Sequence, residues 1–132
     1  MASLRRGIAR LGQADRRALA LLLLLPVVVT TLPSLLGYPP ITDDNLIQNY
    51  PLRAFSGELI AQGHWPLWNP FAWSGNALLA SMNAGSLHPT TLLFSFLPGL
   101  WAWLGNLWAT YWFAGLGAYA LGRYVDLRPR PA

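Results

Sequence analysis

The chain has 132 residues, of which 54% are hydrophobic and only 11% are charged. Because a typical soluble domain is about 25% charged, this composition argues against an ordinary water-soluble domain, and the high hydrophobicity excludes a disordered chain. The absence of cysteine excludes disulfides, thiolate metal sites and a cysteine nucleophile. All nine basic residues are arginines and the net charge is +4, but no nucleic-acid-binding motif accompanies them, so we expect no nucleic-acid partner.

The chain begins with a basic N-terminus over residues 1–17, followed by a run without ionisable side chains over residues 18–37. About 20 helical residues span roughly 30 Å, the hydrocarbon thickness of a bilayer, so the run predicts a first transmembrane helix. Pro26 and Pro33 would kink it, which a membrane helix tolerates when neighbours satisfy the freed carbonyls. A signal peptide has a similar pattern, but this run is long and lacks a small-residue cleavage site, so we expect an uncleaved helix.

A second apolar region predicts an interfacial segment over residues 90–99 and a second transmembrane helix over residues 100–122. Tryptophans near the start of this helix suit the aromatic belt of a membrane interface. Small residues recur at four-residue steps, which favours close packing of another helix, although an alanine-rich helix without a partner would show the same pattern. These small residues are Thr110, Ala114, Ala118 and Gly122.

The arginines predict the topology. Five lie before residue 18 and three lie in the tail over residues 123–132, whereas the loop over residues 38–89 contains only Arg53. Because basic residues collect on the cytoplasmic side, we expect both termini in the cytoplasm and the loop outside. The predicted fold is an all-α, multi-pass membrane protein with two transmembrane helices joined by a long extracytoplasmic loop, and the lipid bilayer is its first partner. A product secreted after cleavage near Gly37 is a remaining alternative.

The loop is rich in aromatic residues, so we expect it to be folded. An amphipathic surface helix is predicted from Asp44 to Gln62, capped by Thr42 or Asp43, bent at Pro51 and ended by Gly63. Prolines and tryptophans then predict a rigid turn over residues 64–71. A second turn over residues 73–76 and a short helix over residues 77–84 are expected to follow.

The loop sequence carries a pattern of the form D-x-x-x-Q-x-Y-P-x-R-x-F-x-x-E-x-x-x-x-G-x-x-P-L-W-N-P, followed by S-G-x-x-L-L-A. The matching residues are Asp44, Gln48, Tyr50, Pro51, Arg53, Phe55, Glu58, Gly63, Pro66, Leu67, Trp68, Asn69 and Pro70, then Ser74, Gly75, Leu78, Leu79 and Ala80. Over residues 18–128 the chain resembles the start of the YfhO-type bacterial membrane proteins, which are similar to the GT-C glycosyltransferases. It departs from them at Met82-Asn83 and His88-Pro89, where family members often have Gln and Tyr-Pro. Those proteins are several times longer, so the resemblance implies the amino-terminal part of a GT-C-like fold in the bacterial cytoplasmic (inner) membrane.

The resemblance implies sugar transfer from a polyprenyl-phosphate-sugar donor at the outer membrane face. Asp44 matches the carboxylate that acts as base or metal contact in that class, with Asp43 as the alternate, and a divalent metal is compatible with it. A base must lie within hydrogen-bond reach of the acceptor hydroxyl. Gln48 would orient the carboxylate or bind a sugar hydroxyl, and Arg53 would pair with the donor phosphate. The other candidate substrate-binding residues are Glu58, Trp68 and Asn69.

Each of these residues also has a structural interpretation. The two aspartates can cap a helix, Arg53 and Glu58 can form a solvated pair or contact lipid head groups, and Trp68 and Asn69 can belong to a turn alone. His64 and His88 have no recognised ligand spacing, so no metal site is predicted from them.

Two functions therefore remain open. The first is the amino-terminal part of a glycosyltransferase-like protein, which we expect to be inactive as this short chain, with the remaining transmembrane helices of a longer protein as partners. The alternative is a non-enzymatic two-helix membrane protein that acts as an assembly module with partner membrane proteins. The sugar, the acceptor, the metal dependence and the oligomeric state stay open.

Overall fold

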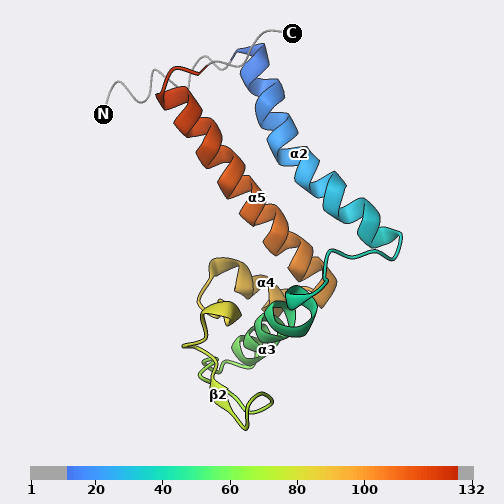
Figure 1. Cartoon of the computed structure of the whole chain (residues 1–132), viewed down its shortest axis with the longest axis vertical. Helices are drawn as coiled ribbons and strands as arrows, with labels where there is room; N and C mark the ends of the chain where they lie inside the picture. The colour runs from blue at the N-terminus through green and yellow to red at the C-terminus, as the bar shows by residue number, and fades with distance from the viewer. Residues whose placement is uncertain (1–11, 128–132) are drawn as a thin grey trace.

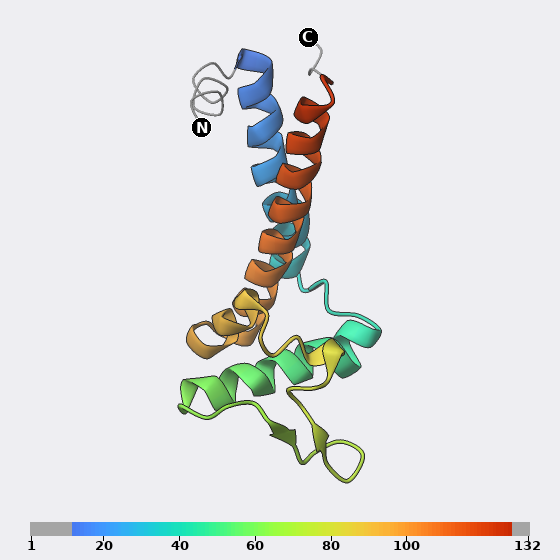
Figure 2. The same ribbon diagram turned by 90° about the vertical axis from the view of Figure 1, so that its left-hand side faces the viewer.

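The computed structural model describes residues 12–127, which are mostly helical. Two long helices, α2 (Gln13–Leu35) and α5 (Gly99–Tyr124), run antiparallel beside each other, and the intervening segments gather at one end of the pair (Figures 1 and 2). The start of α2 and the end of α5 lie together at the opposite end. The chain between them contains, in order, η1 (Asn45–Asn49), α3 (Tyr50–Ala61), β1 (Trp68–Asn69), β2 (Asn76–Ala77), η2 (Met82–Ala84), η3 (Pro89–Leu92) and α4 (Leu93–Phe96).

Among the helices of residues 12–127, only α2 is both long and apolar enough to cross a membrane. Most of its leucines face outward; the side chains of Leu21 and Leu24, for example, are 65% and 62% exposed. The helix begins five residues before the expected start, and the left-handed Gly37 (φ +89°) follows its end. Because a buried core helix would cover its leucines, the exposed apolar surface of α2 fits lipid contact.

Contacts from α5 support α2 where its prolines interrupt it. The Nε1–H of Trp112 donates to the carbonyl of Leu23 over 2.9 Å, three residues before Pro26. The Nε1–H of Trp108 donates to the hydroxyl of Thr30 over 2.9 Å, and that hydroxyl donates in turn to the carbonyl of Pro26 over 2.8 Å. Pro26 lacks the N–H that would pair with the carbonyl four residues earlier, so these indoles bind α2 close to a missing backbone hydrogen bond.

Of the two expected transmembrane helices, only α2 is long and apolar enough to count as a span among the described helices. At 26 residues α5 is long enough, but with its Trp, Tyr, Gly and Asn side chains it does not reach the hydropathy of a membrane span. The predicted small-residue stripe does not face α2 either, because Thr110, Ala114 and Ala118 are exposed. The side chain of Leu22 instead packs at Gly115, where an added Cβ would lie 3.1 Å from Leu22 Cδ2.

Helix α3 lies across the loop end of α5 and packs tightly on α4 (Figure 2). An added Cβ at Gly57 would lie 2.4 Å from Phe94 Cβ, and the Ser95 hydroxyl donates to the Gly57 carbonyl over 2.9 Å. The ring of Tyr50 meets the rings of Phe94 and Trp103 edge-on, with centroids 6.0 and 5.9 Å apart. These contacts attach the loop to the helix pair.

The helix predicted from Asp44 to Gln62 is present as two pieces. A π-helical turn, η1, precedes α3, and Pro51 lies in the first turn of α3, where its missing N–H costs no hydrogen bond. Gly63 (φ +77°) ends α3 as expected: its N–H donates to the Ile60 carbonyl and the next N–H donates to the Leu59 carbonyl.

Two short strands add a β-hairpin to the predicted all-α fold. Trp68 pairs with Ala77 and Asn69 with Asn76, in an antiparallel register. The short helix expected over residues 77–84 is therefore wrong: this segment holds the end of β2 and the 3₁₀ turn η2. The reason is a long-range contact, because the fully buried Leu78 donates its N–H to the Leu67 carbonyl over 2.9 Å.

Candidate functional site

The two candidate catalytic carboxylates, Asp43 and Asp44, are exposed at the start of η1. The expected capping role is wrong, because within the described segment neither side chain accepts a capping hydrogen bond. A backbone carbonyl pairs with the first turn instead: the N–H of Leu46 donates to the Asp43 carbonyl over 2.9 Å, and Asp43 adopts φ +50°. Asp44 and Gln48, one turn apart, share no hydrogen bond among the described contacts, so both side chains stay open to solvent.

A pocket of about 450 Å³ lies between η1, the start of α3 and the hairpin. We call it the amide pocket, because amide side chains from three elements line it: Gln48 from η1, Asn69 from β1 and Asn76 from β2. Trp73, in the turn between the strands, and Ser81, after β2, complete the rim. The fold thus brings the predicted Gln48 and Asn69 together and adds Trp73, Asn76 and Ser81, which the sequence analysis did not single out.

Trp68 and Asn69 serve first as parts of the hairpin. Asn69 is 5% exposed, and its Oδ1 accepts the N–H of Phe71 over 2.9 Å. The indole of Trp68 covers Gly75 so closely that a Cβ there would lie 2.4 Å from its ring. Gly75 also has φ +105°, which favours glycine. The structural interpretation is therefore correct only in part: Asn69 caps the turn that follows it, but Trp68 and Asn69 lie in strand β1 rather than in a turn. The Asn69 side chain also contributes to the wall of the amide pocket.

Arg53 faces away from the amide pocket and enters a polar cluster against α5, which we call the Arg53 cluster: Arg53, His88, Thr90 and Asn106. Arg53 Nη1 donates to Asn106 Oδ1 over 2.9 Å and to Thr90 Oγ1 over 3.4 Å. The Thr90 hydroxyl also donates to Asn106 Oδ1 over 2.5 Å and lies 2.7 Å from His88 Nδ1. A Cβ at Gly85 would lie 2.8 Å from Arg53 Nη2, so glycine permits this approach.

The hydrogen-bond partners of the Arg53 guanidinium are uncharged side chains. Within residues 12–127 the single ion pair joins Arg123 to Asp15, so no described carboxylate pairs with Arg53. Burial lowers the pKa of the Arg53 guanidinium from its ordinary value, because desolvation disfavours the charged form. A half-buried cation without an acidic partner carries positive potential that favours a nearby anion.

The expected pair between Arg53 and Glu58 does not form. Glu58 is exposed and its Oε1 accepts a long hydrogen bond of 3.4 Å from Gln62. Residues five positions apart on an α-helix point in different directions, because only spacings of three and four share a face. Glu58 instead lies at the edge of an open hollow that Phe55 and Phe71 also line.

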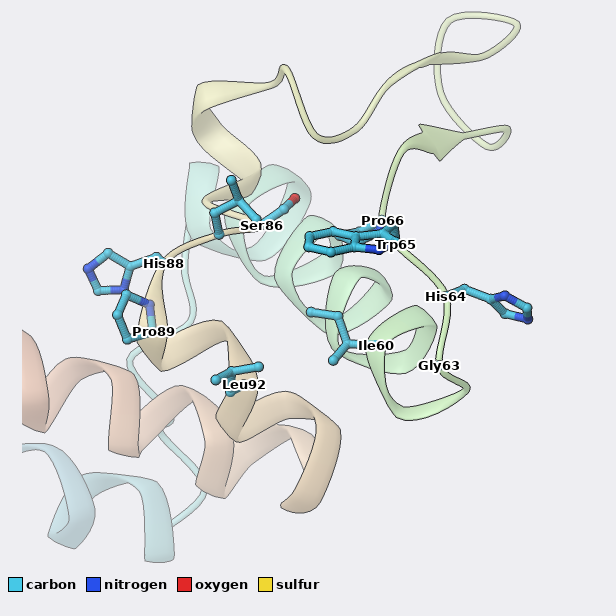
Figure 3. A pocket seen from close by; sticks show the side chains of 10 residues that line it. Ile60, Gly63, His64, Trp65, Pro66, Ser86, His88, Pro89 and Leu92 are labelled. Atoms are coloured by element: carbon cyan, nitrogen blue, oxygen red, sulfur yellow. The ribbon is translucent and has the colours of Figure 1, made fainter.

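A third hollow, the Trp65 pocket, lies between the end of α3, the segment after it and η3 (Figure 3). It has a volume of about 340 Å³ and a largely apolar lining that includes Ile60, Trp65 and Leu92. Figure 3 shows the rings of His64 and His88 at opposite ends of the pocket, pointing away from each other. Within the part of the chain that the structure describes, no three His, Asp or Glu side chains form a group suited to a metal ion.

Comparison with known proteins adds no relative. No protein-family model matches the sequence, no curated protein is similar to it, and no solved structure matches the chain. The resemblance to the YfhO-type proteins therefore stays a prediction.

The candidate residues fall into three places. Gln48 and Asn69 share the amide pocket, Arg53 lies in the cluster against α5, and Asp44 is exposed before η1. The role of Asn76 was not predicted. The turn before it was the available signal, because a turn between two extended segments indicates a hairpin, and a hairpin would place Asn76 beside Asn69.

Proposed function

We propose that the chain forms the amino-terminal part of a polytopic bacterial inner-membrane protein, related to the GT-C glycosyltransferases, that takes part in sugar transfer from a lipid-phosphate donor at the outer membrane face. The observation that carries the proposal is a folded loop, attached to the end of an apolar helix pair, that presents uncharged amides, an unpaired arginine and an exposed carboxylate. In this proposal Asp44 is the base and Arg53 attracts the donor phosphate.

The proposal includes α5 as a second transmembrane helix, and the pairing of the long helices supports this. Contacts run from Tyr119 on Asp15, at one end, to Trp108 on Thr30, toward the other. If α2 crosses the bilayer, the packing of this helix of 26 residues along it supports a second crossing. Its length of about 39 Å is sufficient, at about 1.5 Å per residue. Both ends of the chain would then face the cytoplasm.

The chain alone is proposed to be inactive, because the described part does not enclose a donor lipid. Asp44 is exposed, and the Arg53 guanidinium already donates to Asn106. Further membrane helices are the proposed partners. They have a surface available, because Thr110, Ala114 and Ala118 on α5 are exposed and small side chains allow helices to approach closely. The same surface supports the alternative function, a non-enzymatic assembly module.

The topology is tested with single cysteines in intact cells, which the cysteine-free chain makes simple. Glu58→Cys lies on the exposed loop side and should react with a membrane-impermeant maleimide. Tyr124→Cys, which replaces a side chain that is 86% exposed at the other end of the helix pair, should react only after the membrane is opened. The reverse pattern, or equal labelling at both sites, contradicts the proposed orientation.

The reaction is tested separately in membranes of the native host, in which the proposed partner helices accompany the chain. Membranes are supplied with a polyprenyl-phosphate-linked radiolabelled sugar, and transfer is compared between the native chain, Asp44→Asn and the control Asp126→Asn, which also removes an exposed carboxylate. We expect transfer above that of membranes without the chain, reduced by Asp44→Asn only, and no turnover by the purified chain. Equal transfer with and without the chain would favour the assembly module.

A further inference from the structure

The amide pocket combines hydrogen-bonding groups with an absence of charge. Its lining residues include Gln48, Asn69, Asn76 and Ser81, and none of the residues that line it is ionisable. The side chains of Gln48, Asn76 and Ser81 make no hydrogen bond to any described residue, and Asn76 Oδ1 is buried without a partner. Buried polar atoms in native proteins are nearly always paired, and this oxygen, which protein atoms cover behind the pocket wall, is one of two exceptions among the described residues.

An aromatic ring stands beside these groups in an unfavourable backbone conformation. Trp73 is 90% exposed and has φ +57°, a region that bulky side chains rarely occupy. Ser74 and Gly75 follow with φ +61° and +105°, so three successive left-handed residues hold the indole at the pocket rim. Such strain persists at sites where the geometry itself is used, for example in binding a ligand.

The charges of the loop lie elsewhere. Arg53 turns toward Asn106 on α5, and Glu58 lies in the open on α3. An anionic ligand would therefore find no cation in the amide pocket, and burial of its charge without a partner would be costly. Amide and hydroxyl groups suit a ligand with many neutral hydroxyls, while an indole face suits the C–H surface of a pyranose ring.

We propose that the amide pocket binds an uncharged saccharide, with the amides on the sugar hydroxyls and Trp73 against the face of the ring. A volume of about 450 Å³ accommodates one or two sugar rings. The inference deepens the proposed function, on which it rests for the location of the pocket outside the cell. In this arrangement the two parts of a glycosyl phosphate bind at different places: the neutral sugar lies in the amide pocket, and the phosphate lies outside it.

Binding is tested by saturation-transfer NMR on the full chain in lipid nanodiscs, with cellobiose, maltose and diacetylchitobiose as neutral probes and glucuronic acid as the charged probe. Trp73→Asn removes the ring but keeps a residue that tolerates positive φ, so the hairpin should stay folded. We expect a loss of about tenfold in affinity, equivalent to about 1.4 kcal/mol. Trp73→Phe, which retains a ring, should keep most of the binding.

The matched control is Trp65→Asn, which removes an exposed indole from the separate Trp65 pocket and should leave saccharide binding unchanged. The inference is overturned if none of the neutral probes receives saturation from the native chain, if Trp73→Asn binds as well as the native chain, if glucuronic acid binds more tightly, or if empty nanodiscs give the same signal. Because this assay needs neither a donor lipid nor a cell, its failure is distinguishable from failure of the transfer assay.

Discussion

Replacement of Gly57 by alanine tests the contact that attaches the loop to the helix pair. The added Cβ would lie 2.4 Å from Phe94 Cβ and 2.8 Å from the Phe94 carbonyl carbon, whereas ordinary contacts begin near 3.4 Å. Helices α3 and α4 must therefore separate by about 1 Å, the difference between 3.4 and 2.4 Å. Because backbone atoms are involved, a rotamer change cannot relieve the overlap.

The free-energy cost of this overlap is partly offset by the higher helix propensity of alanine. Overpacking costs about 1–3 kcal/mol. Replacing a helical glycine by alanine recovers about 0.5–1 kcal/mol. The middle of the two ranges gives a fall of about 1 kcal/mol in the free energy of unfolding, with an upper bound of about 2.5 kcal/mol. A fall of about 1 kcal/mol lowers the melting temperature by roughly 4 °C in a chain of this size. The hydrogen bond from the Ser95 hydroxyl to the Gly57 carbonyl, 2.9 Å long, should lengthen at the same time.

The assay is thermal unfolding in lipid nanodiscs, followed by tryptophan fluorescence, with limited proteolysis of the loop as a second measurement. Gly117→Ala is the matched control, because Gly117 also lies in a helix but an added Cβ there meets no atom within 4 Å. The control should be neutral or slightly stabilising. If Gly57→Ala melts with the native chain and the control, the close contact between α3 and α4 is incorrect.

Three further substitutions probe polar contacts, each measured by the same melting assay. Arg53→Lys keeps the charge but loses the planar fork on Asn106, and should cost about 1–2 kcal/mol; an unchanged melting temperature would mean that the cluster contributes little. Trp112→Phe removes the donor to the Leu23 carbonyl and should cost about 1 kcal/mol; a larger loss would indicate packing rather than the hydrogen bond. Asp15→Asn keeps the size of a residue that is 7% exposed but removes its charge, so it should lower stability most at low salt; equal effects at all salt concentrations would contradict an ionic contribution.

The parts of the fold that depend on local sequence could be predicted. The charge-free run predicted α2, and Gly63 predicted the end of α3, because both signals act over a few neighbouring residues. The hairpin was missed because β1 and β2 are only two residues long each, and their pairing depends on a buried leucine, Leu78, and on the turn between them. Short strands carry almost no periodic signal of their own.

The candidate site shows the same limit. Gln48 and Asn69 were selected from the sequence and share a pocket, but Trp73 and Asn76 reach it only through the hairpin. The direction of the Arg53 side chain could not be predicted from neighbouring residues either, because its partner Asn106 on α5 lies 53 residues further along the chain. Helical spacing does give one part of that result, because it separates Arg53 from Glu58.

The polar contacts near both ends of the helix pair have a consequence for sequence variation. Asp15 meets Tyr119 and Arg123 at one end, and Thr30 meets Trp108 toward the other. Sliding one helix past the other by a single turn would break both sets together, whereas the leucines between them would find equivalent neighbours. In the proposed membrane location, lipid favours no particular alignment of the two helices. A few hydrogen-bonding side chains would then set the alignment, and the surrounding aliphatic residues could be exchanged for one another at small cost.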